Sequence, residues 1–230
     1  MMRIQFSAVA AGVLAALTLT ACGGGETDAP TVGPSTTPSA FPYPPVQYYT
    51  DVAVRLEEPL RSAAEFALEM TVGGYRMVDP RESEQFRREY RTRVDLDADR
   101  FIEPFETPDF VDDTGGYTVR AVSAEELADG VIEVSVCSFN IPGVYWLRTD
   151  GQVVDPEGPK VALTRPRVQW TDRSAAIGPK PSGPRWLLLD NGVDLKMTEE
   201  SAERECDPFK PEPFVQKMPD PTTPVVTPTR

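Results

Sequence analysis

Residues 131–139 read VIEVSVCSF, and they decide the fold class because apolar and polar side chains alternate along them. A period of two predicts a β-strand, in which Ile132, Val134 and Val136 share one face. Cys137 then points to the opposite face. We expect the apolar face to carry the helix-covered core and the face of Cys137 to lie outside it.

The same period extends along the chain on both sides of this stretch. Four other segments rich in β-branched and aromatic residues predict strands at 117–122, 144–149, 161–170 and 185–190. Asp150-Gly151 suits a tight turn into a short strand at 152–154, and Asn191-Gly192 marks another turn. Adjacent hairpins of this kind predict a mostly antiparallel sheet.

Before the DDTGG stretch at 112–116 the apolar spacing is helical instead. It predicts a long amphipathic helix over 59–78, with Pro59 in its first turn. A charged helix over 81–94 and a short one over 98–105 follow. Helices first and a hairpin-built sheet second indicate an α+β domain with the helices on one face of the sheet.

This order of elements resembles a known family. Helical segments, the TPDF junction at 107–110, and then a meander with one cysteine in its second strand are similar to the NTF2-like (cystatin-like cone) domain of actinobacterial envelope lipoproteins. The resemblance covers about Tyr49 to Cys206. It implies a curved sheet and a cavity between the sheet and the helices.

The first 21 residues have the layout of a signal peptide, with Arg3 followed by an apolar stretch from Phe6 to Leu19. Because that stretch has only about 14 residues, it is short for spanning a bilayer. The string LTAC, residues 19–22, resembles the lipobox of bacterial lipoproteins, which implies that Cys22 carries lipid and becomes the new N-terminus. An uncleaved anchor and ordinary secretion are the alternatives.

Composition divides the rest of the chain. Residues 22–47 are rich in Pro, Gly, Thr and Ser and predict a flexible linker, although FPYPP at 41–45 could be a polyproline ligand. We expect one α+β domain over 48–215 and a disordered, proline-rich tail over 216–230. The linker would hold the domain off the outer face of the bacterial cytoplasmic membrane.

Charge and residue usage exclude several classes of function. The formal net charge of −13 argues against nucleic acid as a partner, because a polyanion repels phosphates. The chain has no histidine, which removes Ser-His-Asp and Cys-His catalysis. It also lacks a glycine-rich phosphate loop. We therefore assign no catalytic, cofactor or metal residues.

Once Cys22 is assigned to lipid, Cys137 and Cys206 are the remaining cysteines. An even pair in an exported protein predicts a disulfide, and a free reactive or metal-binding pair is the alternative. The disulfide would hold the C-terminal segment across the outer face of the sheet. Phe209 and Phe214 could then cover apolar surface there.

Two acidic stretches are candidate sites. Residues 95–106, DLDADRFIEPFE, match much of an EF-hand calcium loop, but Arg100 stands where the loop needs glycine. We interpret them as a charged helix face. Asp109, Asp112 and Asp113 are close enough in sequence to raise a carboxyl pKa for general-base work, although exposed acids before a glycine turn are the simpler interpretation.

Aromatic residues on the predicted strands could line an apolar ligand pocket, with Arg165 or Arg167 as a polar anchor. These residues are Tyr117, Tyr145, Trp146, Trp170 and Trp186. Core packing explains them equally well.

These observations predict a non-catalytic, membrane-anchored envelope lipoprotein that binds a protein partner or a small apolar ligand. The alternative is an NTF2-like enzyme of isomerase or cyclase type, in which Asp109 or Asp190 acts with a tyrosine. The solute-binding part of a transporter is a third possibility, but the ordered part is short for two lobes.

Overall fold

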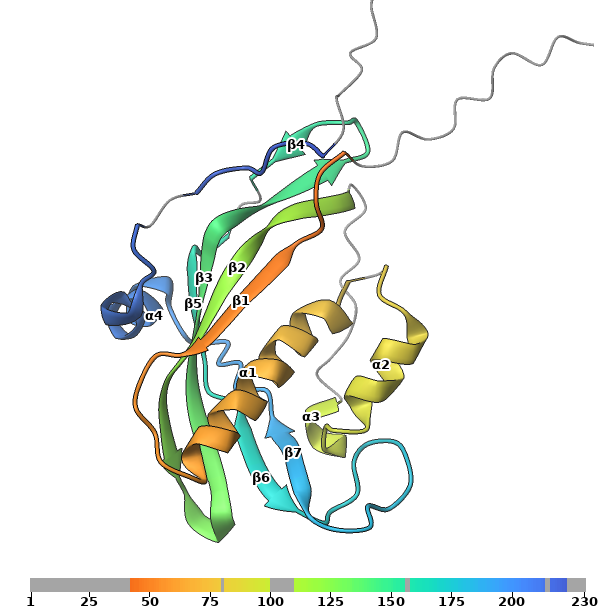
Figure 1. Cartoon of the computed structure of the whole chain (residues 1–230), viewed down its shortest axis with the longest axis vertical. Helices are drawn as coiled ribbons and strands as arrows, with labels where there is room; N and C mark the ends of the chain where they lie inside the picture. Colours follow the sequence, from red (N-terminus) through yellow and green to blue (C-terminus); the bar gives the residue numbers. More distant parts are fainter. Residues whose placement is uncertain (1–41, 80, 100–109, 156–157, 214–215, 223–230) are drawn as a thin grey trace, which may run out of the picture. The chain divides into compact units, whose positions relative to one another are not determined.

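The computed structural model describes residues 42–79, 81–99, 110–155, 158–213 and 216–222 (Figure 1). They form an α+β fold around an open, mostly antiparallel sheet of seven strands, as the alternation around residue 131 predicts. The strand order is β1-β2-β3-β6-β7, and β4 and β5 each pair with β3.

The bounds of the elements are as follows. The helices are α1 (Leu60–Met77), α2 (Glu84–Arg91), α3 (Leu96–Asp99) and α4 (Glu199–Cys206). The strands are β1 (Gln47–Val52), β2 (Phe110–Glu126), β3 (Val131–Arg148), β4 (Val153–Val154), β5 (Val161–Thr164), β6 (Arg167–Thr171) and β7 (Arg185–Asp190). None of the described helices is long and apolar enough to cross a bilayer.

Helix α1 occupies nearly the whole segment predicted for it. Pro59 caps its start, and the helix ends at Met77, just before Val78. Helix α2 is shorter than predicted at both ends, and it starts at Glu84 because the side chain of Ser83 accepts a hydrogen bond from the N–H of Phe86 and so caps the first turn. Of the third predicted helix, 98–105, only the first two positions lie within the described residues.

Strand β1 was not predicted, and it pairs in parallel with β2. A parallel pair cannot be closed by a tight turn and needs a long crossover connection. The segment between β1 and β2, which holds α1, α2 and α3, supplies that connection. The helices therefore precede the main sheet in sequence because they link its edge strand to its interior.

The strands of the central β2–β3 hairpin are longer than predicted. Strand β2 runs through the DDTGG stretch that we interpreted as a turn, and β3 joins the two predicted strands at 131–139 and 144–149. The backbones pack closely where Gly115 meets Gly143. Gly115 has φ +99°, and a Cβ there would lie 1.8 Å from the carbonyl oxygen of Gly143. Glycine is thus required at this position.

The predicted strand at 161–170 is divided into β5 and β6 by Arg165 and Pro166. Proline has no N–H to donate to a ladder, which disfavours one continuous strand here. Strands β5 and β6 both pair with β3, but at different places along it: β6 pairs near Val131 and β5 near Cys137.

Helix α1 packs against the sheet through small and apolar residues. Ala63, Ala67 and Met70 belong to the same buried cluster as Val119 of β2 and Val134 of β3. Alanines at this contact allow a close approach of helix and sheet. This cluster lies on the face of β3 that the alternating pattern predicts as the core face.

A second buried cluster covers the opposite face of β3. Cys137 forms a disulfide with Cys206 at the end of α4, as predicted, and both are fully buried. Phe139 and Leu163 pack in the same cluster, and Phe209 lies partly buried against it. This face lies outside the core under α1, as expected, and the C-terminal segment crosses it; that this segment forms a helix, α4, over a second core was not predicted (Figure 1). Phe214 lies outside the described residues.

The two ends of the described chain meet. The N–H of Thr222 donates to the carbonyl oxygen of Pro42 at 2.5 Å. Gln216, the first residue of the predicted tail, donates its side-chain amide to the carbonyl oxygen of Asn140 at 3.0 Å. The described part of the proposed tail is therefore hydrogen-bonded to the domain.

Candidate functional site

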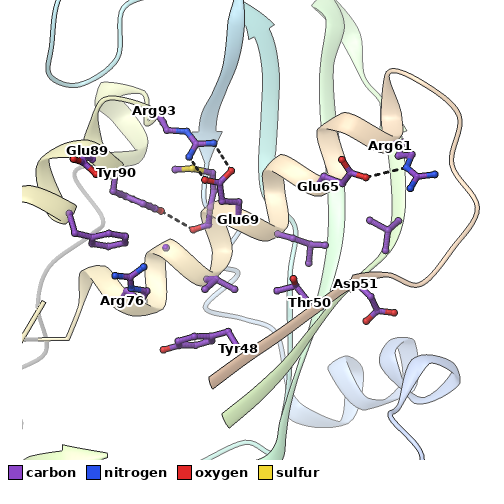
Figure 2. A pocket seen from close by; sticks show the side chains of 16 residues that line it. Tyr48, Thr50, Asp51, Arg61, Glu65, Glu69, Arg76, Glu89, Tyr90 and Arg93 are labelled. Atoms are coloured by element: carbon purple, nitrogen blue, oxygen red, sulfur yellow. Dashed lines mark hydrogen bonds and ion pairs between the residues drawn. The ribbon is translucent and has the colours of Figure 1, made fainter. Parts of the chain in front are cut away.

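A groove of about 680 Å³ runs along the flank of α1, between the edge strand β1 and helix α2 (Figure 2). Helix α1 contributes a stripe that begins at Arg61 and ends at Arg76. Tyr48, Thr50 and Val52 contribute from β1. The spacing of these three residues places their side chains on one face of the strand.

The groove has an apolar floor and a charged rim. Val72 of α1 and Phe86 of α2 are partly exposed and contribute apolar surface, whereas Leu68 and Tyr90, which also line the groove, are almost fully buried. Charged residues of β1, α1, α2 and the segment just after α2 also line the groove. An apolar centre within a polar border is the usual anatomy of a protein interaction surface.

The contact between α1 and α2 depends on Gly73. A Cβ at this position would lie 2.6 Å from the ring of Tyr90, so any side chain would displace the ring. The hydroxyl of Tyr90 donates to the carbonyl oxygen of Met70 at 3.1 Å. Burial raises the pKa of Tyr90 and keeps its hydroxyl protonated. Gly73 thus sets how closely α2 approaches one wall of the groove.

Ion pairs hold the rim. The guanidinium of Arg93 binds both carboxylate oxygens of Glu69, and this hydrogen bonding lowers the pKa of Glu69. Arg61 binds Glu65 at 3.1 Å. The guanidinium of Arg76 lies 3.8 Å above the ring of Phe86. The cations of the rim are therefore fixed in position by neighbours.

A stack of three tyrosines adjoins the groove at Tyr48. The rings of Tyr48, Tyr75 and Tyr117 lie 5.5 to 6.2 Å apart and nearly parallel. Tyr75 donates its hydroxyl to Ser138 at 2.8 Å. Burial raises the pKa of all three tyrosines, that of Tyr117 to about 12. The cluster therefore presents neutral phenols at physiological pH.

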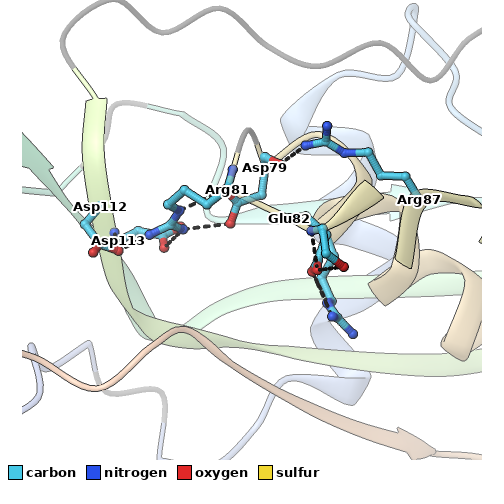
Figure 3. Close-up of polar contacts among 8 residues, drawn as sticks. Asp79, Arg81, Glu82, Arg87, Asp112 and Asp113 are labelled. Atoms are coloured by element: carbon cyan, nitrogen blue, oxygen red, sulfur yellow. Dashed lines mark hydrogen bonds and ion pairs between the residues drawn. The ribbon is translucent and has the colours of Figure 1, made fainter. Parts of the chain in front are cut away.

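Arg81 gathers three carboxylates beside this stack. It binds Asp79, Asp112 and Asp113 (Figure 3). Burial raises the pKa of Asp113 despite the nearby guanidinium. Burial also acts on Asp79, but its hydrogen bonds to Arg81 outweigh it and lower its pKa. The raised pKa suggested for the acidic cluster thus applies to Asp113, with desolvation as its main cause. Asp109 lies outside the described residues.

The five aromatic residues predicted for a pocket do not line this groove. Tyr117 belongs to the tyrosine stack, and Trp186 packs on the core and on Phe66. Trp170 meets Trp186 edge to face at 5.5 Å and is 58% exposed. Tyr145 and Trp146 lie in the second half of β3, where Trp146 pairs with Val154 of β4.

The polar residues predicted for that pocket are engaged elsewhere. Arg165 binds Glu205 of α4 at 2.7 Å, and Arg167 binds Glu133 at 2.8 Å. Asp190 is exposed and accepts a hydrogen bond from the N–H of Gly192, as a turn residue does. Its place in this turn does not suit the catalytic role considered for it.

Part of the calcium-like stretch 95–106 is described. Asp95 is buried and binds Arg173 at 2.8 Å, and Asp99 binds Arg91 at 2.5 Å. Arginine partners occupy carboxylates that a calcium loop would need for the ion. Among the described residues, no group of three acidic or cysteine side chains is placed to hold a metal ion.

The sequence interpretation missed the groove because it missed β1. The signal was present in QYYTDV, residues 47–52, which is rich in residues that favour strands. Its position next to the prolines of the linker hid that signal. Cys22, the leader and most of the linker lie outside the described residues.

Comparisons with known proteins leave the site to be interpreted from its own geometry. A scan against protein-family models found no match, and searches of curated proteins and of solved structures found none either.

Proposed function

We propose that this protein is an envelope lipoprotein, anchored through Cys22 to the outer face of the bacterial cytoplasmic membrane, whose domain binds a protein partner without catalysis. The disulfide between Cys137 and Cys206 carries the proposal. It uses two of the three cysteines and leaves Cys22, at the end of the apolar leader, as the odd one. Disulfides persist in exported proteins, in agreement with a leader.

The first and last described residues of the chain lie together. Pro42 accepts a hydrogen bond from the N–H of Thr222. The described part of the domain therefore begins and ends at one place, which suits attachment through a single tether.

The domain itself is proposed to be NTF2-like. A long helix, α1, packs on the sheet after a single edge strand, and the hairpin meander follows. This order supports the resemblance noted in the sequence. The groove supports a binding role, and a partner protein suits its charged rim better than a small apolar ligand does.

Metabolic labelling with an acyl probe tests the anchor. Wild-type chain should take up label and partition with membranes, whereas Cys22→Ala should do neither. Cys137→Ala with Cys206→Ala is the matched control, since it removes cysteines without touching Cys22 and should keep the label. Equal labelling of wild type and Cys22→Ala would refute the anchor.

One observation favours a second candidate, acid–base chemistry of isomerase or cyclase type. The pKa of Asp113 is raised, and its carboxylate interacts electrostatically with the hydroxyl groups of Tyr48 and Tyr117. A partly buried carboxyl beside neutral phenols could exchange a proton with a bound substrate. A ¹³C NMR titration of the Asp113 carboxyl tests it: a pKa at or below that of an ordinary aspartate would remove this candidate.

A further inference from the structure

The two end strands of the order β1-β2-β3-β6-β7 differ in what covers their outer sides. At one edge, residues 93–95 cover β7: the N–H of Leu188 donates to Arg93 and its carbonyl accepts from Asp95, at 3.0 and 2.7 Å. At the other edge, β1 pairs with β2 on its inner side, and no described strand pairs with its outer side. An unpaired strand edge is a template for another strand, and proteins usually block it.

The outer edge of β1 offers a regular set of backbone groups. Ala53 donates its N–H to Ala121 of β2 at 2.9 Å. In a parallel pair, alternate residues direct both their N–H and their C=O to the same neighbour, so Tyr49 and Asp51 face β2. Tyr48, Thr50 and Val52 therefore present their backbone groups outward. The edge carries no proline or lysine between 47 and 52 that would block pairing.

The same three residues line the groove with their side chains. A strand added to β1 would place every second side chain over the flank of α1, on the side of the partly exposed Val72. The outward backbone groups and the groove that would accept side chains thus lie along the same strand, β1.

We propose that the edge of β1 and the groove beside α1 bind an extended peptide segment of a partner protein by strand addition, with apolar side chains at alternate positions. Repeated outward N–H and C=O groups at two-residue spacing match the backbone of an extended chain. A helix, whose backbone groups bond internally, cannot satisfy them, and neither can a lipid tail. Main-chain pairing supplies affinity and the groove supplies selectivity for apolar side chains.

This inference rests on the proposed function for the kind of partner, but the two fail separately. Peptide binding is measured on the purified full chain in detergent, where no membrane is needed. Acyl labelling reports only on Cys22.

A random library of twelve-residue peptides displayed on phage is the probe. Selected peptides are synthesised and their dissociation constants measured against wild type, Thr50→Pro and Thr50→Ala. Proline at 50 removes an outward N–H without touching the pairs to β2, and should weaken binding at least tenfold. Alanine keeps the N–H and should bind within about twofold of wild type. Far-ultraviolet circular dichroism checks that both variants are folded.

A second measurement does not depend on any variant folding. Each selected peptide is resynthesised with a single N-methyl group at successive positions. Strand addition predicts that methylation weakens binding at every second residue and is tolerated between them. A pattern without this period, or a library that yields no binding peptide, would overturn the proposal. So would a dimer of wild type, seen by sedimentation velocity, that Thr50→Pro converts to monomer, because the edge would then serve a second copy of this chain.

Discussion

Cys137, in the middle of β3, is joined to Cys206, at the end of α4, across 69 positions of sequence. Both sulfur-bearing side chains are fully buried. The bond holds α4 over the face of the sheet that α1 does not cover, where Phe139 and Leu163 pack beneath it. A helix of eight residues would otherwise depend on a small apolar contact alone.

Removing the disulfide should therefore lower stability. Closing a loop of this length contributes about 4 kcal/mol in the chain-entropy model. For a domain of this size the double change Cys137→Ala with Cys206→Ala should lower the melting temperature by roughly 10 °C. Calorimetry measures the shift, and Cys22→Ala serves as the control that should leave it unchanged. Two reactive thiols in the untreated wild-type domain would contradict the bond.

Substitution of Gly73 in the wall of the groove should lower the stability of the fold, whereas substitution of its neighbour Gly74 should not. Gly73→Ala places a methyl group 2.6 Å from the ring of Tyr90 and should destabilise the fold by about 1–3 kcal/mol. Gly74→Ala meets only the Tyr90 hydroxyl, at 3.5 Å, and should be neutral or stabilise by up to about 1 kcal/mol. Urea denaturation of the two variants provides the comparison. Equal effects of the two substitutions would show that Tyr90 does not pack as described.

Alkaline pH should destabilise the protein through the tyrosine stack. The pKa of Tyr117 is raised by burial from 10 to about 12 in the folded state. Stability from this group is therefore fully present below pH 10 and is lost as the pH rises through about 12. The melting temperature of Tyr117→Phe should fall less between pH 10 and 12 than that of wild type. Tyr49→Phe, which changes an exposed ring on β1, should follow wild type.

Acid should weaken the rim of the groove. Hydrogen bonding to Arg93 lowers the folded pKa of Glu69 below its ordinary value of 4.5. The stability it contributes is present above pH 4.5 and is lost as the pH falls through the folded pKa. Because the Glu69 side chain is 60% exposed, Glu69→Gln should cost no more than about 1 kcal/mol at pH 7. The cost should vanish near pH 2, and a cost that does not change with pH would exclude this ion pair as its source.

Local patterns in the sequence predict much of this fold. Helical spacing after Pro59 predicts α1 almost to its last residue, and alternation from Val131 predicts the faces of β3. The count of cysteines predicts the bond between Cys137 and Cys206 once Cys22 is set aside. The helix and the strand faces depend on residues that are close together in the sequence. The disulfide follows from the number of cysteines, which can be counted in the sequence.

The candidate site could not be predicted from such local patterns. Strand β1 exists because Gln47 pairs with Gly116, and α2 can close the groove because Tyr90 fits over Gly73. Segments distant in the chain make these contacts, and alternation or helical spacing carries no information about them. The sequence by itself determined the α+β class, the face of β3 that packs against α1, and the cysteine pairing. Only the tertiary structure decided which sheet edge stays open and what lies beside it, because an edge is defined by the strand that does not pair with it.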